Sequence, residues 1–423
     1  WCLYGVGRAA DGAAGEPPRN FHRSGGIDIM KIALIAGEAS GDKLGAALID
    51  GFNAILQQPS DFIGVAGPRM MKRGMDSLFS MQELSVMGIV EILKQYPRLK
   101  RRLNETADYI IAQNPDVLIT IDSPEFSLRL AKIIHAKSDI PTVHYVAPTV
   151  WAWRPKRADK IAQFIDHVLA LFPFEPPLMQ RAGMSCDFVG HPVVTDPIAT
   201  NEEVAAFRDD FGIGDAPLVL ILPGSRNNEI SKLMAPFGET LALARQTMPD
   251  LQCVLPAAPH VVSAVQEAVQ NWPIRPIVLD HRELGETTYE VAKRAAFRAA
   301  DVALAASGTV SLELAANDTP MVIAYDMGWL SRQIIGRMLI TDTVTLVNLV
   351  TDTRVIPEFI GKNCRADLIA PALLESLIAP QGQLRALRDT MDKLGRGAPS
   401  PGTQAAGSVI RFLNGTQRAG KAS

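Results

Sequence analysis

Short apolar runs alternate with longer amphipathic stretches from Met30 to about residue 350. The runs are rich in Val, Ile and Leu on both faces, which is typical of parallel strands covered by helices on each side. Strands separated by helical patterns predict βαβ units and doubly wound sheets. The expected strands are 31–36, 62–66, 116–121, 141–146, 167–171 and 186–189, followed by 217–222, 251–255, 275–279, 301–305 and 320–324.

The series of runs restarts near residue 196, between Gly190-His191-Pro192 and the polar stretch 199–203. This restart predicts two Rossmann-like α/β domains that face each other across a cleft, because open sheets bind ligands at the carboxyl ends of their strands. Leucines at helical spacing predict C-terminal helices, for which the N-terminal domain is one packing surface. The expected division is a tail without fold at 1–29, α/β domains at 30–195 and 196–365, C-terminal helices at 366–414 and a flexible tail at 415–423.

Composition adds exclusions to this pattern. The 423 residues are 47% hydrophobic and 21% charged, as in ordinary globular proteins. A net charge of −3 and an aromatic content of 6% argue against a nucleic-acid-binding protein. The four cysteines lie far apart without metal-ligand spacing, so reduced thiols in a cytoplasmic protein are expected. No apolar run reaches the ~18 residues of a membrane-spanning helix.

Two motifs of the first domain place carboxylates at the ends of predicted strands. Gly37-Glu38-Ala39-Ser40-Gly41-Asp42 follows the first strand. Its carboxylates disfavour phosphate and suit sugar hydroxyls, although Ser40 or Asp42 could equally cap the following helix. Asp122-Ser123-Pro124 follows the strand 116–121, where a general base would point into the cleft. The same residues suit a helix N-cap with proline at the first helical position, so both interpretations stay open.

Two further segments of the first domain are unusual. Trp151 and Trp153 fall within three residues of each other, beside Arg154. Flat rings next to cations suit sugar faces, acyl chains or anionic groups, and packing under a loop is the alternative. The stretch 87–102 begins apolar and ends basic, which suits either an anionic membrane surface or a solvated helix face. Its cations are Lys94, Arg98, Lys100, Arg101 and Arg102.

The second domain carries two candidate phosphate-binding motifs. Leu222-Pro223-Gly224-Ser225-Arg226 follows the strand 217–222 and offers backbone amides and a cation, with Glu229 as a cap of the next helix. Ser307-Gly308-Thr309 opens a helix after the strand 301–305, and Glu313 can accept hydrogen bonds from ribose hydroxyls. Together they predict a nucleotide-diphosphate site. The motif after the first strand is not G-x-G-x-x-G, which disfavours a dinucleotide-dependent oxidoreductase.

Two facing α/β domains with these features suit a nucleotide-sugar glycosyltransferase that has a lipid-like acceptor. In their order along the chain, the motifs resemble those of the lipid-A-disaccharide synthases, bacterial glycosyltransferases of family 19 with the GT-B architecture. The resemblance runs from about Met30 to Cys364 and rests on GEASGD (37–42), SVMGIVEIL (85–93), DSPEFSLRLA (122–131), VWAWRPKR (150–157), FPFEP (172–176), GHP (190–192), LPGSR (222–226), SGTVSLE (307–313) and NLV…RVIPE (348–358).

The resemblance implies an inverting transfer from UDP-2,3-diacylglucosamine to 2,3-diacylglucosamine 1-phosphate. The products would be the β-1′,6-linked lipid A disaccharide 1-phosphate and UDP, without a metal or other cofactor. It further implies a cytoplasmic protein held peripherally at inner-membrane surface lipids, and self-association into a homodimer in some members. Nucleic acid is not an expected partner.

The resemblance also assigns roles to individual residues. Asp122 is the expected base, with Glu38 or Asp42 as alternatives. The basic run Lys94 to Arg102 is expected at the membrane. The expected acceptor-binding residues are Glu38, Ser40, Asp42, Trp151, Trp153 and Arg154. The expected donor-binding residues are Gly224, Ser225, Arg226, Ser307, Gly308, Thr309, Glu313, Asn348, Arg354, Glu358 and His191, of which His191 could instead only pin the hinge.

The chain departs from the family pattern at two places. Ser127 stands where Asn is usual, and Phe359-Ile360-Gly361 replaces a frequent Leu-Leu-Gln. Neither change removes the expected base or a phosphate ligand. The rival hypotheses are another GT-B enzyme that uses UDP-N-acetylglucosamine (a 2-epimerase or a MurG-like transferase) and a non-catalytic nucleotide-sugar- or lipid-binding protein. The first leaves the segment 87–102 unexplained, and the second would tolerate Asp122→Asn.

Overall fold

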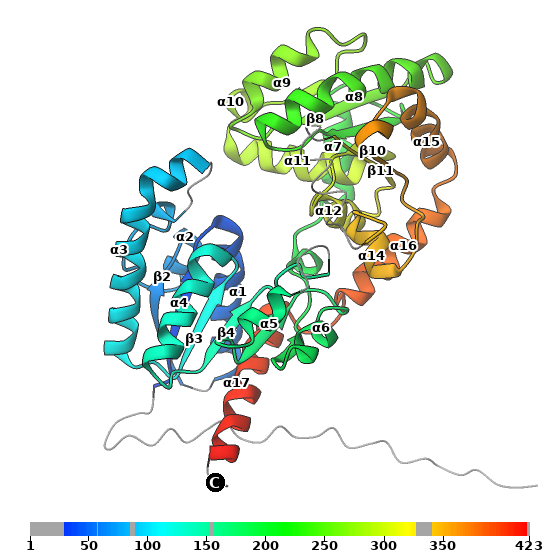
Figure 1. The fold of residues 1–423 in the computed structure, drawn as a ribbon. Helices are drawn as coiled ribbons and strands as arrows, with labels where there is room; N and C mark the ends of the chain where they lie inside the picture. The colour runs from blue at the N-terminus through cyan, green and yellow to red at the C-terminus, as the bar shows by residue number, and fades with distance from the viewer. Residues whose placement is uncertain (1–28, 57, 85–88, 152–155, 327–340, 421–423) are drawn as a thin grey trace, which may run out of the picture.

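The computed structural model folds into two α/β domains, one above the other in Figure 1. It describes residues 29–56, 58–84, 89–151, 156–326 and 341–420, with the side chains of 89–96 and 416–420 left aside. Residues 1–28 of the expected tail, and the expected site residues Trp153 and Arg154, lie outside the described residues.

The N-terminal sheet consists of six parallel strands in the order β2-β1-β3-β4-β5-β6. Each of the six predicted strands is present, with ends within one residue of the prediction. Their apolar runs are buried on both faces, as in β3, where all five residues are buried. The strands are β1 (Lys31–Ala36), β2 (Asp61–Val65), β3 (Val117–Ile121), β4 (Thr142–Tyr145), β5 (His167–Ala170) and β6 (Ser185–Phe188).

The C-terminal sheet is also six-stranded and parallel, in the order β12-β11-β10-β7-β8-β9. Five of its strands are those predicted, and the sixth, β12, was missed. β12 has only three residues and pairs with β11 at the edge of the sheet, so it carries no long apolar run. The strands are β7 (Leu218–Leu222), β8 (Gln252–Pro256), β9 (Ile277–Leu279), β10 (Val302–Ala305), β11 (Met321–Tyr325) and β12 (Glu358–Ile360).

Helices cover both sheets. In the N-terminal domain α3 packs on α4, and α1 packs on α17, the last helix of the chain. The helices of this domain are α1 (Ala39–Ile55), α2 (Pro68–Met71), η1 (Met81–Glu83), α3 (Ile89–Gln113), α4 (Pro124–Lys137), α5 (Arg157–Ile161), α6 (Pro176–Arg181), η2 (Pro192–Thr195) and α17 (Pro401–Gly420).

In the C-terminal domain α8 packs against α9 and α15, while α12 packs against α11, α14 and α16. The helices are α7 (Asn201–Asp210), α8 (Asn227–Thr247), α9 (Val262–Val269), α10 (His281–Leu284), α11 (Glu286–Ala299), α12 (Val310–Ala316), α14 (Leu346–Thr351), η3 (Gly361–Asn363), α15 (Ala366–Ile378) and α16 (Gln381–Lys393).

Strand order reverses at one point in each sheet. In the first sheet β1 lies between β2 and β3, and in the second β7 lies between β8 and β10. Ligands of doubly wound sheets bind outside the carboxyl ends of the strands at such a switch point. The loops that follow β1, β3, β7 and β10 are therefore the expected places for a site, and they carry four of the motifs singled out in the sequence.

The last helix returns to the N-terminal domain, where it lies beside α1 in Figure 1. Two glycines allow the close approach of these helices. A Cβ at Gly402 would stand 2.1 Å from the Ala47 carbonyl oxygen, and one at Gly51 would stand 2.2 Å from the Gly402 carbonyl oxygen. Ser408 also joins α17 to the sheet, since its hydroxyl lies 2.8 Å from His167 Nε2 and donates to Asp187.

The chain crosses between the domains twice, and the two crossings touch. The His191 amide donates to the Leu394 carbonyl oxygen at 3.0 Å. Gly190 and Gly395 lie against each other with positive φ angles of 84° and 101°, which glycine adopts without strain. Next to this point, Lys43 of α1 forms an ion pair with Asp196. The hinge is therefore a double connection with one ion pair across it.

Candidate active site

The loops after β1 and β3 meet at the switch point of the N-terminal sheet. A Cβ at Gly37 would lie 2.4 Å from the Ser123 hydroxyl oxygen, so only glycine leaves room at that position. Asp122 and Ser123 both adopt left-handed backbone angles, with φ of 47° and 44°. Non-glycine residues rarely adopt this conformation, and such strain gathers at functional sites.

Asp122 is held at this turn with its carboxyl group partly buried. Its amide donates to the Tyr145 carbonyl oxygen at 2.9 Å, which fixes the turn on β4. Burial raises the pKa of the Asp122 carboxyl, and a hydrogen bond from the Ser123 amide opposes this shift only in part. A carboxylate with increased proton affinity at this position is suited to act as a general base.

The expected helix start at this motif is confirmed in position, because Ser123 stands at the N-cap of α4 and Pro124 is its first residue. The side chain of Ser123 nevertheless makes no capping hydrogen bond. The hydroxyl oxygens of Ser123 and Ser127 are buried and have no hydrogen-bond partner among the described residues. Ser127, which departs from the family pattern, therefore leaves a buried hydroxyl unsatisfied in the first turns of α4.

The motif after β1 divides into exposed and buried carboxylates. Glu38 and Ser40 are exposed at the start of α1. Asp42 is only 3% exposed, and its two carboxylate oxygens accept the amides of Arg69 and Met70 at 2.9 and 3.0 Å. Asp42 therefore holds the first turn of α2, and the structure does not turn it toward an acceptor as the sequence had suggested.

Trp151 lies in an aromatic cluster next to the hinge. Its ring packs edge-on against Phe172 and Phe174, with ring centroids 6.3 and 5.4 Å away. The indole N–H donates to the carboxylate of Glu175, which is buried and also accepts the amides of Leu171 and Phe172. Burial raises the pKa of Glu175 to about 7. Sequence reasoning gave Glu175 no role, although it lies within the FPFEP motif.

His191 borders the same cluster from the hinge. Its ring lies 5.4 Å from that of Phe172, and its Nδ1 accepts the Val193 amide. Burial lowers the pKa of His191 to about 4, which keeps the ring neutral. His191 is not among the residues that line the pocket of the second domain, and its hydrogen bonds to Leu394 and Val193 lie in the hinge, which is one of the two roles that the sequence left open.

An open cavity of about 470 Å³ lies between the loops that follow β7 and β10. Seven of the expected donor-binding residues line it. Helix α11 supplies its remaining wall with side chains that the sequence analysis did not single out. The lining residues are Leu222, Pro223, Gly224, Ser225, Arg226, Glu229, Pro256, Ala258, Tyr289, Lys293, Phe297, Ala306, Ser307, Gly308, Thr309, Val310 and Glu313.

The loop after β7 is closed by its own carboxylate. Glu229 folds back from the first turn of α8, and one of its oxygens accepts the amides of Ser225 and Arg226 at 3.0 and 3.2 Å. Its other oxygen accepts from the Arg226 guanidinium, which is 70% exposed. Gly224, with φ of 101°, has no room for a Cβ against Glu229. The sequence predicted that these amides bind phosphate, but in the structure they donate to Glu229. Arg226 is among the residues that line the pocket.

The loop after β10 is open to the pocket. Gly308 and Thr309 are exposed, and the Ser307 hydroxyl donates to the Val344 carbonyl oxygen at 3.3 Å. Glu313 follows on α12, where burial raises the pKa of its carboxyl and the Lys293 ammonium opposes that shift. This half of the pocket matches the predicted arrangement of exposed backbone beside a carboxylate.

Asn348 and Glu358 support this loop from behind and do not line the pocket. Asn348 is buried and donates to Glu358, whose carboxylate also accepts the amides of Val344 and Thr345. In this arrangement the two side chains hold the loop, and a direct contact with a donor stays a prediction. Arg354 forms an exposed ion pair with Asp342 and is likewise not among the lining residues.

Helix α11 presents Tyr289, Lys293 and Phe297 to the pocket at a spacing of four residues. This i, i+4, i+8 spacing places them on one face of the helix, a signal that was present in the sequence. The Tyr289 hydroxyl donates to the Ala257 carbonyl oxygen at 2.9 Å, and burial raises its pKa to about 12.

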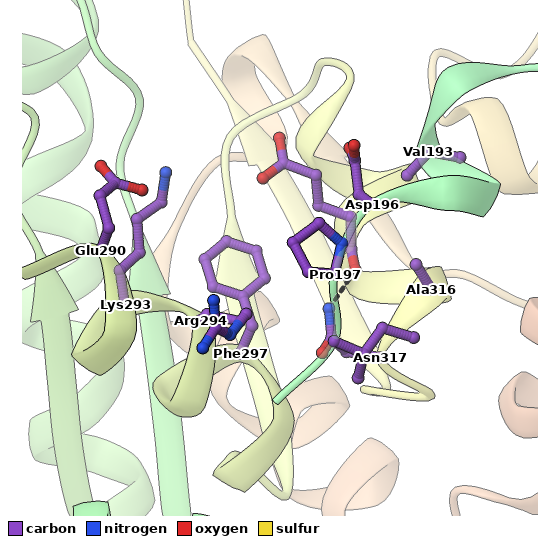
Figure 2. A pocket seen from close by; sticks show the side chains of 11 residues that line it. Val193, Asp196, Pro197, Glu290, Lys293, Arg294, Phe297, Ala316 and Asn317 are labelled. Carbon is purple, nitrogen blue, oxygen red and sulfur yellow. Dashed lines mark hydrogen bonds between the residues drawn. The ribbon is translucent and has the colours of Figure 1, made fainter. Parts of the chain in front are cut away.

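A second, smaller cavity of about 180 Å³ adjoins this pocket at the hinge (Figure 2). Lys293, Phe297 and Glu313 line both cavities and form the wall between them. Its other side is formed by Asp196, Pro197 and neighbouring residues of the inter-domain connection. The candidate donor pocket is thus directly continuous with the hinge.

The basic segment of α3 is largely neutralised by local carboxylates. Arg98 and Arg102 both form ion pairs with Glu83, and Arg101 pairs with Glu105. Arg102 also lies over the ring of Phe79 at 4.6 Å. Lys100 is exposed, and the side chain of Lys94 lies outside the described residues.

Within the described ranges, no group of three or more His, Cys, Asp or Glu side chains is arranged to hold a metal ion. Among the same residues, no helix has both the length and the apolar character needed to cross a bilayer.

Comparison with known sequences gives one consistent family. The family model described as lipid-A-disaccharide synthetase matches residues 32–395. The lipid-A-disaccharide synthase of Ruegeria pomeroyi is 54% identical over 387 residues, covering 92% of this chain and 96% of the relative. That of Rhodospirillum centenum is 42% identical, covering 91% of this chain and 95% of the relative.

Comparison with solved structures agrees on the fold. The UDP-GlcNAc 2-epimerase of Neisseria meningitidis, solved with UDP-GlcNAc, has a TM-score of 0.58 at 12% identity and covers 92% of this chain and 100% of its own. A glycosyltransferase of Rickettsia africae has a TM-score of 0.56 at 11% identity, with coverage of 92% and 99%. At these identities the likeness is one of fold, and it supports the GT-B architecture.

Proposed function

The chain belongs to the lipid-A-disaccharide synthetase family, and on that premise we propose that it joins two acylated glucosamine units with release of UDP. The donor is UDP-2,3-diacylglucosamine, the acceptor is 2,3-diacylglucosamine 1-phosphate, and the product is the β-1′,6-linked disaccharide 1-phosphate. Agreement over nearly the whole chain with relatives of this one name carries the conclusion. The 2-epimerase alternative is not favoured, because its members share only the fold.

The chemistry that we propose is a single displacement. Asp122 takes the proton from the acceptor 6-hydroxyl while that oxygen attacks the anomeric carbon of the donor. The bond from this carbon to the diphosphate oxygen breaks, and UDP leaves with the electron pair, which inverts the anomeric centre. The strained turn at the end of β3 and the raised pKa of Asp122 support this role.

The donor is proposed to bind in the cavity between the loops after β7 and β10. Arg226 and the exposed backbone of Ser307-Gly308-Thr309 would contact the diphosphate, and Glu313 would accept hydrogen bonds from the ribose. Asn348 and Glu358 act on this site by holding the residues behind Ser307.

The acceptor is proposed to bind on the N-terminal side of the hinge. Glu38 and Ser40 are exposed, and the contact of Gly37 with Ser123 brings their loop against the loop that carries Asp122. Trp151 and the aromatic rings beside it supply an apolar surface. Trp153 and Arg154 join this proposal from the family resemblance alone.

The decisive measurement is UDP release from the donor, with and without acceptor, by wild type and Asp122→Asn. The amide keeps the shape of the turn and cannot take a proton, so kcat should fall by about 10²–10⁴-fold while UDP affinity is unchanged. Glu38→Gln is the matched comparison on the proposed acceptor side, and it should raise the acceptor KM while it leaves kcat within a few-fold of wild type.

Other outcomes would redirect the proposal. Acceptor-dependent release that survives Asp122→Asn but collapses in Glu38→Gln would move the base to Glu38. Release from UDP-N-acetylglucosamine without an acceptor, and none from the acylated donor, would restore the epimerase alternative.

We further propose that the protein binds the membrane surface peripherally through the basic end of α3. Glu83 and Glu105 neutralise part of the charge of its cations, and a modest positive charge remains. Binding to an anionic membrane should therefore be salt-sensitive. Replacing Lys100 and Arg101 by Gln should reduce co-sedimentation with anionic vesicles several-fold, and Lys132→Gln on the neighbouring helix α4 serves as control. Equal binding of all variants would contradict the proposal.

Self-association remains a proposal from the resemblance, which sedimentation velocity would test.

A further inference from the structure

Lys293 is a half-buried cation of the donor pocket without a fixed partner. It lies on α11 and lines both the donor pocket and the hinge cavity. Among the described residues its ammonium has no ion-pair partner within 4 Å, and the carboxyl on which its charge acts is that of Glu313 on α12. In Figure 2 its side chain extends beside that of Glu290, along the wall of the cavity. A partly desolvated charge left unpaired is costly, so this ammonium is available to an anionic ligand.

The neighbouring cations are already engaged. Arg294, the next residue along α11, is paired with Glu203. Arg226, which lines the same pocket from the loop after β7, forms an ion pair with Glu229. Among the described residues that line the donor pocket, Lys293 is therefore the cation whose charge is not already matched by a carboxylate within ion-pair distance.

The loop after β7 has no free amides at Ser225 and Arg226 to bind phosphate, so the cations of the pocket matter more for binding an anion. Glu229 occupies the amides of Ser225 and Arg226, and it brings a negative charge to the side of the pocket where phosphate was expected. With Glu313 also in the lining, two carboxylates face two cations. The charge of a diphosphate adds to that of the carboxylates, so each of the two cations contributes to holding it beside the exposed backbone of Ser307-Gly308-Thr309.

We propose that Lys293 binds the diphosphate of the nucleotide-sugar donor, as a second cation opposite Arg226, and steadies the UDP that leaves. This inference rests on the proposed function and adds to it a residue that neither the motifs nor the family resemblance had assigned. Lys293 stays protonated throughout and forms no bond to the sugar. Its contribution should therefore depend on the phosphates of the ligand and not on the uridine.

The test compares the binding of UDP, UMP and uridine to the full-length protein by titration calorimetry. Lys293→Met keeps the length of the side chain and removes its charge. A hydrogen bond to a charged group contributes about 1.5–3 kcal/mol, so UDP affinity should fall by about 10- to 100-fold, UMP affinity less, and uridine affinity not at all. Lys293→Arg should retain most of the UDP affinity, and Arg298→Met on the exposed side of α11 should match wild type.

Each alternative result has a distinct meaning. Equal losses for UDP and uridine in Lys293→Met would show a structural role and overturn the inference, as would unchanged UDP affinity. In turnover, a donor KM that rises with an unchanged kcat would leave Lys293 as a ground-state contact only and would overturn its role toward the leaving group. Wild-type protein that binds no UDP at all would overturn the proposed function as well.

Discussion

Two consecutive non-glycine residues with positive φ angles, Asp122 and Ser123, make the turn at the end of β3. Each costs on the order of 1–3 kcal/mol and persists only where the surroundings fix it. Here the turn is fixed by the hydrogen bond from the Asp122 amide to the Tyr145 carbonyl oxygen on β4. Gly37 after β1 leaves room for the Ser123 side chain, because glycine has no Cβ. The sequence placed a carboxylate at this strand end, but the strained turn depends on contacts between segments far apart in the chain, which local patterns do not carry.

Asp42 illustrates how a matching motif residue can serve the fold. Asp42→Ala would leave the amides of Arg69 and Met70 without an acceptor, so the free energy of unfolding should fall by about 1–2 kcal/mol, as for a lost helix cap. Glu38→Ala, four residues earlier and exposed, should change it by less than about 0.5 kcal/mol. Urea unfolding measures both. Wild-type stability in Asp42→Ala would remove the structural role and return Asp42 to the candidate bases.

Both alternatives for Asp42 were visible in the sequence, as a helix cap or as an acceptor ligand. The expected cap was of its own helix, whereas the observed cap is of α2, 28 residues away along the chain from Asp42 to Met70. Residue type therefore predicted the chemistry of the carboxylate correctly, and only the tertiary fold could say which amides it meets.

Element boundaries followed directly from the apolar pattern, because each predicted strand is a buried run between polar helical segments. β12 was not predicted because it has no long apolar run. Its residue Glu358 is polar, and its side chain receives four donors from the segment 343–348. The family resemblance marked Asn348 and Glu358 as important, but it could not separate residues that contact a donor from residues that hold the loop behind it.

The contact of α17 with α1 gives a test at the scale of elements. Gly402→Ala would place a methyl group 2.1 Å from the Ala47 carbonyl oxygen, so the helices must move apart, at a cost of about 1–3 kcal/mol. Gly415→Ala lies in the same helix with nothing within 4 Å, and it should stabilise by about 0.5–1 kcal/mol through helix propensity. Thermal unfolding and protease sensitivity of the C-terminus measure both effects. A Gly402→Ala variant as stable as wild type would mean that α17 is not docked as described.

At the scale of the whole molecule, the restart of the strand pattern near residue 196 predicted two sheets, and both are present. The hinge between them could not be predicted in this way. Its contacts join residues that are distant in sequence, such as His191 with Leu394 and Lys43 with Asp196. The hinge cavity shares Lys293 and Glu313 with the candidate donor pocket, so the side chains proposed to contact the donor also border the connection between the domains.

Three buried histidines, His144, His167 and His191, connect the stability of the whole protein to pH. Burial lowers the pKa of each to about 4, so each stays neutral in the folded state while the unfolded chain takes up protons near pH 6.5. The unfolded state thus binds more protons between pH 6.5 and 4, and stability must fall as the pH drops through this range. The carboxyl of Glu175, with a pKa raised to about 7, works in the opposite direction and reduces the slope. The carboxyls of Asp122 and Glu313, whose pKa values burial also raises, act in the same sense as Glu175.

The expected slope can be measured by urea unfolding at pH 7.5, 6 and 5. The free energy of unfolding should change little above pH 7 and should decrease below pH 6.5, by about 2 kcal/mol for each histidine at pH 5, less the opposing contribution of the buried carboxyls. His144→Asn keeps an acceptor or donor near the Thr120 hydroxyl, which lies 2.8 Å from His144 Nδ1, and removes the titrating group. This variant should lose the part of the slope that one histidine contributes, whatever its stability at pH 7.5. A slope as steep as that of wild type would show that His144 has the same pKa in the folded and the unfolded protein, and that its burial does not lower its pKa.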